Sequence, residues 1–251
     1  MEDKNLRKIY PISWITESKK LIEFIQEWNS SSEDNLLVAD FASGEYDRVP
    51  SFFTKFLPPL FKMELDYEKR IVVYCTDIHL LRLESLLSKL TDENLLDNVR
   101  IVHAALETMD TKAKLIELSQ EFIIEHSETS TWLDDFLIGE NRLPPQCFDI
   151  GILNTDVVGY LFEYYKEYSD AEKALSMVWR MIRQNGLLIV TMPCLEFTVD
   201  NIDVLEKTGF TFLEGLDINT TTGEKTDLKR NVSLDKLSNL GHYSYLVFSK
   251  I

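Results

Sequence analysis

Two acidic residues, Asp40 and Asp77, each end a run of apolar residues. Residues 36–45 read LLVADFASGE, so small residues follow the first acid closely, and Gly44 tolerates a positive φ angle. Such a turn lets the backbone come close to a bound molecule, and a carboxylate at the strand end can accept hydrogen bonds from it. The order of strand, acid, small-residue turn and helix is typical of sheets that bind a nucleotide-type ligand at their carboxyl ends.

Polar residues also follow a later apolar run, residues 147–154, which continues into Asn154, Thr155 and Asp156. If the strands are parallel, these side chains reach the same edge of the sheet as the two acids.

The sequence shows no pattern of residues typical of a metal site. The four histidines and three cysteines form no CxxC pair and have no metal-ligand spacing, so we predict no metal site.

The elements that must position these residues alternate along the chain. Apolar runs predict strands at residues 36–40, 70–77, 98–103, 147–154, 187–192, 210–218 and 243–249. Helical spacing of apolar residues predicts helices between them, including an amphipathic helix over residues 111–126. Residues 127–147 read as an irregular insertion that could form a lid or a partner surface. The alternation predicts a parallel sheet with helices on both faces, and the last two strands are expected to be antiparallel.

Composition limits the classes of function. The chain has 251 residues and a formal net charge of −16, which argues against a broad nucleic-acid surface unless a basic partner supplies one. The scattered cysteines indicate reduced thiols in an intracellular protein. We see neither a signal peptide nor an apolar segment of the roughly 20 residues needed to cross a bilayer, so we expect a cytoplasmic or nuclear protein without a membrane anchor.

From about Asn35 to Ile251, the order and spacing of these elements resemble the class I, Rossmann-like S-adenosylmethionine-dependent methyltransferases. Asp40-Phe41-Ala42-Ser43-Gly44 is similar to the first motif of that family, and residues 181–190 resemble its helix–Gly–strand segment. The resemblance implies an α/β, doubly wound, mostly parallel seven-stranded sheet with helices on both faces and an antiparallel last strand. Residues 35–251 would form this domain, and residues 1–34 a helical lead-in packed on it.

The resemblance also implies a site and an activity, methyl transfer from S-adenosylmethionine to a protein or small-molecule acceptor. Asp77 stands where the family's acid holds the ribose hydroxyls, and Ile78 would pack against adenine. The residues implied to bind the cofactor are Asp40, Ala42, Ser43, Gly44, Asp77, Ile78, Glu107 and Asn154. Asn154 and Asp156 are the candidate catalytic residues. The acceptor would lie above Asn154 and the helix that carries Tyr160, Tyr164 and Tyr165.

Two departures from the family pattern keep alternatives open. Tyr46 stands where the family prefers a small residue, and Ala104-Ala105 fill the place of a polar residue that reaches adenine, which leaves that contact to backbone or to Glu107. A lapsed pocket would make the chain a non-catalytic interaction or scaffold module. A nicotinamide-dependent oxidoreductase is a weaker alternative, because the G-x-G-x-x-G loop is absent.

The site residues also have structural alternatives. Asp40 could be a turn acid at a strand end, and Asp77 could cap the helix that follows it. The three tyrosines could simply pack against the core.

Overall fold

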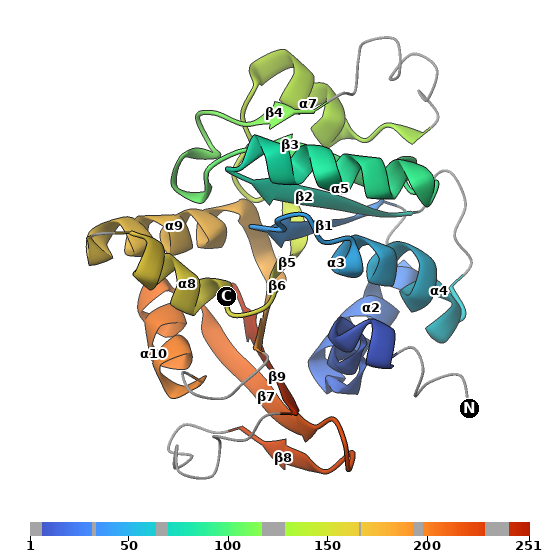
Figure 1. Ribbon diagram of the computed structural model, residues 1–251, viewed down its shortest axis with the longest axis vertical. Helices are drawn as coiled ribbons and strands as arrows, with labels where there is room; N and C mark the ends of the chain where they lie inside the picture. The colour runs from blue at the N-terminus through green and yellow to red at the C-terminus, as the bar shows by residue number, and fades with distance from the viewer. Residues whose placement is uncertain are drawn as a thin grey trace.

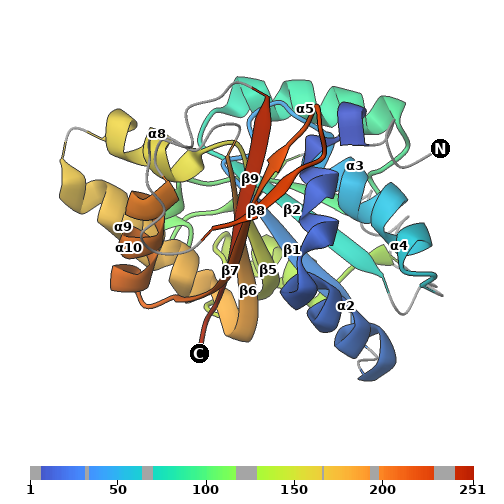
Figure 2. The same ribbon diagram turned by 90° about the horizontal axis from the view of Figure 1, so that it is seen from below.

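The computed structural model describes residues 7–31, 34–63, 70–116, 129–165, 167–192, 198–228 and 241–251. A mixed sheet runs through the protein and carries helices on both faces (Figures 1 and 2). The strands are β1 (Leu36–Phe41), β2 (Ile71–Asp77), β3 (Val99–His103), β4 (Lys114–Leu115), β5 (Phe148–Leu153), β6 (Ile182–Met192), β7 (Thr211–Asn219), β8 (Lys225–Asp227) and β9 (His242–Ser249). The α-helices are α2 (Lys19–Ser31), α3 (Arg48–Ser51), α4 (Leu57–Leu60), α5 (Leu80–Asp92), α7 (Trp132–Glu140), α8 (Val157–Tyr164), α9 (Tyr168–Met181) and α10 (Thr198–Thr208).

The strand order is β4-β3-β2-β1-β5-β6-β9-β7-β8. The five strands from β3 to β6 in this order are parallel, whereas β9 lies antiparallel between β6 and β7. The predicted α/β sheet with an antiparallel last strand is therefore confirmed. The predicted number of strands is wrong, because the described residues alone form a sheet of nine strands rather than seven. The additions are two short edge strands, β4 and β8, each antiparallel to its neighbour.

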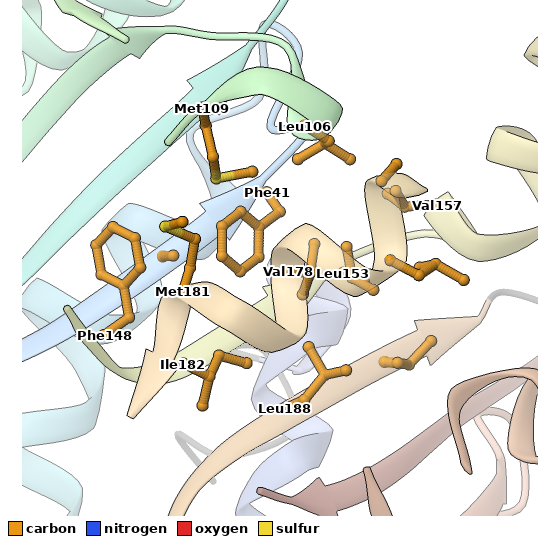
Figure 3. Packing of buried hydrophobic residues seen from close by; sticks show 14 of the residues in the cluster. Phe41, Leu106, Met109, Phe148, Leu153, Val157, Val178, Met181, Ile182 and Leu188 are labelled. Atoms are coloured by element: carbon orange, nitrogen blue, oxygen red, sulfur yellow. The ribbon is translucent and has the colours of Figure 1, made fainter. Parts of the chain in front are cut away.

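The central strands are buried on both faces, which explains their continuous apolar sequences. Every residue of β1 and of β2 is buried. On one face, α7, α8, α9 and α10 enclose an apolar cluster in which the Phe41 ring meets Phe148 edge-on at 5.8 Å (Figure 3). Gly151 of β5 lies under this contact, where a Cβ atom would come within 2.8 Å of Phe41 and of Ile182.

The opposite face of the sheet is covered by the N-terminal half of the chain. A 3-10 helix, Pro11–Glu17, and α2 precede β1, and α2 buries Leu21, Ile25 and Trp28. These side chains join the same apolar cluster as Phe52, Phe53 and the buried leucines of α5. A π-helical turn, Phe52–Phe56, links α3 to α4 within this layer. The N-terminal helices and the strands thus share one core.

Two predictions of secondary structure need correction. The amphipathic helix predicted over residues 111–126 is wrong at its start, because Lys114–Leu115 forms β4 and pairs with Val102 and His103 of β3. Its other apolar positions, Leu118, Phe122 and Ile123, lie outside the described residues. The insertion predicted to be irregular contains α7.

A buried polar network holds α7 against the sheet. Thr131 accepts from the backbone N–H of Asp134, and the Asp134 carboxylate accepts from that of Thr131, which forms a capping box. Asp134 also accepts from Arg100 Nε at 3.0 Å and from the Tyr74 hydroxyl at 2.8 Å. The helix is therefore fixed by its own first turn and by β2 and β3.

The part of the chain that the structure describes contains two cysteines. Cys75 and Cys147 are free, buried thiols there, and Cys194 lies outside it. Among the described helices, none is both long and apolar enough to span a bilayer. Within the same residues, no three His, Cys, Asp or Glu side chains are grouped as metal ligands would be.

Candidate functional site

A cavity of about 250 Å³ opens at the carboxyl ends of β1, β2, β3 and β5. Its walls come from parts of residues 40–49, 77–82, 104–107 and 154–165, which follow those strands. The sheet order reverses beside β1, since β2 and β3 extend it on one side and β5 and β6 on the other. Ligands of doubly wound folds bind at such a switch point, so the topology and the cavity indicate the same place.

The turn after β1 is held in an unusual backbone conformation. Ala42 and Gly44 have φ angles of 56° and 63°. The backbone N–H of Ser43 donates to the carbonyl of Thr76 at 2.9 Å, and that of Gly44 donates to Asp77 Oδ2 at 2.9 Å. The turn is thus tied to β2 at two points. A left-handed conformation at a residue other than glycine is costly, and such strain collects at ligand sites.

Asp77 connects the turn after β1 to the residue that precedes α5. Besides the bond from Gly44, its Oδ1 atom accepts from the backbone N–H of His79 at 2.7 Å. Asp77 therefore has part of the capping role considered above, because it accepts a hydrogen bond from His79, the residue just before α5. A carboxylate has about four acceptor sites, so two remain for a ligand.

Asp40 differs from Asp77 in having an unpaired atom. The residue is 2% exposed and lines the cavity, and its Oδ1 atom is buried without a hydrogen-bond partner among the described residues. Burial raises the pKa of Asp40 well above its ordinary value, and the negative charge of Asp77 adds to this effect. Buried polar atoms of folded proteins are nearly always paired, so an unpaired acid facing a cavity indicates a missing donor or cation.

An apolar wall lies beside the two acids. Ile78 is 43% exposed and lines the cavity together with Ala104 and Ala105. The backbone carbonyl of Ile78 lies 3.0 Å from His103 Nε2, which links the ends of β2 and β3. Small side chains at 104 and 105 leave room for a flat group against Ile78.

Another part of the cavity lining is aromatic. Tyr160, Tyr164 and Tyr165 all line the cavity, and the Tyr165 hydroxyl donates to Glu107 Oε2 at 2.5 Å. Burial raises the pKa of Tyr165, and the bond to Glu107 raises it further. Glu107 lines the cavity, and its described hydrogen bond is to a tyrosine of the chain itself.

The two candidate catalytic residues lie in different places relative to the cavity. Asn154 lines the cavity, and its Oδ1 atom accepts from the Thr191 hydroxyl at 2.6 Å. Asp156 is not among the described residues of the cavity wall; it is the N-cap of α8 and accepts from the backbone N–H of Gly159 at 3.3 Å. Thr155 and Asp156 both have positive φ angles, 64° and 59°, so this turn is strained.

Tyr46 lies at the mouth of the cavity rather than deep within it. It is 57% exposed, and Arg48 and Lys89 approach its ring at 5.8 and 5.9 Å. A Cβ atom placed on Gly44 would lie 3.7 Å from this ring, so Tyr46 covers the turn after β1 from outside.

Some site residues were not predicted from sequence. Thr191 of β6 holds Asn154 and also accepts from the backbone N–H of Thr155 at 3.0 Å. A signal existed, because Thr191 is a polar residue in the apolar run LLIVTM. His79 and Arg82 line the cavity from the residues after β2, a position that the parallel topology alone would have indicated.

No protein-family model matches the chain, and no curated protein matches it. Solved structures are similar to it at low identity. An S-adenosylmethionine-dependent methyltransferase from Aquifex aeolicus has 14% identity and a TM-score of 0.47, with 98% of this chain and 97% of that chain covered. A TehB-like S-adenosylmethionine-dependent methyltransferase from Corynebacterium glutamicum has 13% identity and a TM-score of 0.46, with 97% of each covered. Magnesium protoporphyrin IX methyltransferase from Synechocystis, solved with bound S-adenosylmethionine, has 11% identity and a TM-score of 0.47, with 92% of this chain and 78% of that chain covered.

Proposed function

We propose that the cavity binds S-adenosylmethionine and that the protein transfers its methyl group to an acceptor. The observation that carries the proposal is the unpaired Asp40 Oδ1 atom beside a second buried acid, Asp77. S-adenosylmethionine carries two cations, a sulfonium and an ammonium, and a ribose with two hydroxyl donors. It would therefore bring both positive charge and donors to a pair of carboxylates that otherwise repel each other.

The residues present fit this cofactor. Asp77 would accept from the ribose hydroxyls with its remaining acceptor sites, and Asp40 would face the positive charge. The turn with left-handed φ angles at Ala42 and Gly44 would bring backbone close to the ligand, while Ile78 and the small side chains beside it would hold the adenine ring. Asn154, fixed by Thr191, would complete the floor at the end of β5.

The cofactor supplies an activated methyl carbon, so the protein has to do little covalent chemistry. Positioning an acceptor in line with that carbon supplies much of the rate enhancement. A general base is needed only where the acceptor must lose a proton. The position of Asp156 as a helix cap is therefore compatible with activity, and we do not propose it as a catalytic residue.

A non-catalytic interaction module is the second candidate, favoured by the Tyr46 ring over the turn after β1. Calorimetric titration with S-adenosylmethionine and S-adenosylhomocysteine separates the two candidates. The enzyme proposal requires one binding site per chain. Failure to bind either compound at millimolar concentration would refute it and leave the interaction module.

Variants at Asp77 test the placement of the ribose. Asp77→Ala should weaken binding about 100-fold or more, because each hydrogen bond to a charged group contributes about 1.5–3 kcal/mol. Asp77→Asn keeps one acceptor for the turn and guards against a loss due to unfolding alone. Asp135→Ala on the exposed surface of α7 makes the same charge change outside the cavity and should leave binding unchanged. Unchanged affinity in both Asp77 variants would rule out the ribose placement.

A further inference from the structure

Four side chains form a continuous row along one wall of the cavity, which we call the tyrosine wall: Tyr160, Tyr164, Tyr165 and Glu107. The rings of Tyr160 and Tyr164 stack with centroids 5.7 Å apart, and Tyr164 meets Tyr165 edge-on at 5.3 Å. The Tyr165 hydroxyl then bonds Glu107 at 2.5 Å. The row joins α8 to the 3-10 helix Leu106–Thr108 and ends in a carboxylate.

Core packing does not account for the two outer rings. Helix α8 turns Val157, Val158 and Leu161 into the core. Tyr160 and Tyr164 instead remain 48% and 47% exposed. Because large aromatic side chains gain stability by burial, a pair left open beside a cavity indicates a surface that binds something.

The chemistry of the row favours a cation. Tyrosine faces attract ammonium groups through the ring quadrupole, and the Glu107 carboxylate adds a full negative charge. Tyr165 uses one acceptor site of that carboxylate, which leaves others for a ligand. Asp40 and Asp77 line the same cavity, so with Glu107 the carboxylates there outnumber the guanidinium of Arg82 and favour a cationic over an anionic acceptor.

We propose that the tyrosine wall binds the methyl acceptor and that this acceptor is a small organic amine, protonated in solution. The proposal rests on the proposed function, because it assigns the acceptor of that same site. Before an ammonium nitrogen can attack a methyl carbon, it must lose a proton to free its lone pair. Glu107 takes that proton: the ammonium becomes a neutral amine, and the carboxylate becomes a carboxylic acid.

This proposal uses Glu107 differently from the sequence prediction, which gave it to the adenine of the cofactor. The bond from Tyr165 places the carboxylate at the end of the aromatic row, whereas Ile78, Ala104 and Ala105 form the apolar wall suited to adenine. The two uses of Glu107 give opposite results in Glu107→Gln. A loss of amine selectivity with unchanged S-adenosylhomocysteine affinity supports the acceptor role; the reverse supports the adenine role and overturns the proposal.

The test compares benzylamine with benzyl alcohol, a neutral analogue of nearly the same shape, by NMR titration with and without saturating S-adenosylhomocysteine. The wild type should bind benzylamine about tenfold more tightly, and Glu107→Gln should remove that preference. Tyr164→Leu should weaken benzylamine binding about two- to fivefold, while Tyr164→Phe, which keeps the ring, should retain most of it. Tyr168→Leu is the matched control, since Tyr168 is 75% exposed and packs on Phe162 rather than lining the cavity.

Equal affinity for the amine and the alcohol in the wild type would overturn the proposal. Failure of the proposed function looks different, because it is seen as absent S-adenosylhomocysteine binding in the calorimeter. Cofactor binding without amine preference removes the amine acceptor and leaves methyl transfer standing. Amine preference without cofactor binding removes both, because the wall would then serve another ligand.

Discussion

Replacing Asp40 by asparagine is expected to stabilise the ligand-free protein and to weaken cofactor binding. Both effects arise from one buried carboxylate, which is 2% exposed and has an unpaired oxygen among the described residues. Burial and the nearby charge of Asp77 raise the pKa of Asp40, so the ionised form is costly in the folded state. Asparagine has nearly the same shape but carries no charge.

The gain in stability should be on the order of 1–3 kcal/mol, because an unpaired buried charge costs more than an unpaired neutral amide. For a chain of this length, that corresponds to a rise of about 2–10 °C in the melting temperature. The gain should also depend on pH. Because the folded-state pKa is raised, the wild type is relatively most stable below the ordinary pKa of 3.8 and loses stability as pH rises through the raised value. The advantage of the variant should therefore grow with pH.

Binding should change in the opposite direction. If Asp40 faces a cation of the cofactor, the loss of its charge should weaken binding about 10- to 150-fold, equivalent to about 1.5–3 kcal/mol. Thermal denaturation without ligand and calorimetric titration measure the two effects on the same samples, with Asp135→Asn on α7 as the control for charge. A less stable Asp40→Asn protein that still binds the cofactor at full affinity would refute the reasoning.

Three further predictions concern other buried groups. Burial raises the pKa of Asp149 to about 6, so ionisation of this carboxyl should lower the free energy of unfolding of the wild type by on the order of 3 kcal/mol as pH rises from about 4 to 7. In urea denaturation across that range, the stability of Asp149→Asn should therefore depend less on pH. Parallel pH profiles for the two proteins would contradict this prediction. Arg100→Met leaves the Asp134 carboxylate buried without its cation and should cost about 3–5 kcal/mol in urea denaturation; a loss below 1 kcal/mol would argue against the pair. Thr191→Val removes the hydroxyl that donates to Asn154, so it should lower the free energy of unfolding by about 1–3 kcal/mol and weaken cofactor binding measured by calorimetry. A variant as stable as the wild type would show that this hydrogen bond does not stabilise the fold.

The sequence predicted the parts of the fold that depend on continuous apolar runs. Strands β1 and β2 are buried on both faces, so their sequences carry the signal without help from distant residues. For the same reason Asp40 and Asp77 could be placed at one edge of the sheet, because each follows such a run. Their common location in a cavity then followed from parallel topology.

What could not be predicted depends on contacts between distant parts of the chain. Lys114–Leu115 has helical spacing with later residues, yet pairing with β3 makes it a strand. Asp156 has the right sequence position for a site residue, but its backbone conformation turns it into the cap of α8. The bond between Tyr165 and Glu107 joins residues 58 apart and leaves no local pattern.

A crystal structure of the protein grown with millimolar S-adenosylhomocysteine tests the central claim most directly. The account predicts one molecule in the cavity at the ends of β1 and β2, with its ribose hydroxyls within hydrogen-bond distance of Asp77 and its adenine against Ile78. An empty cavity at saturating ligand, or a ligand bound elsewhere on the chain, would contradict it.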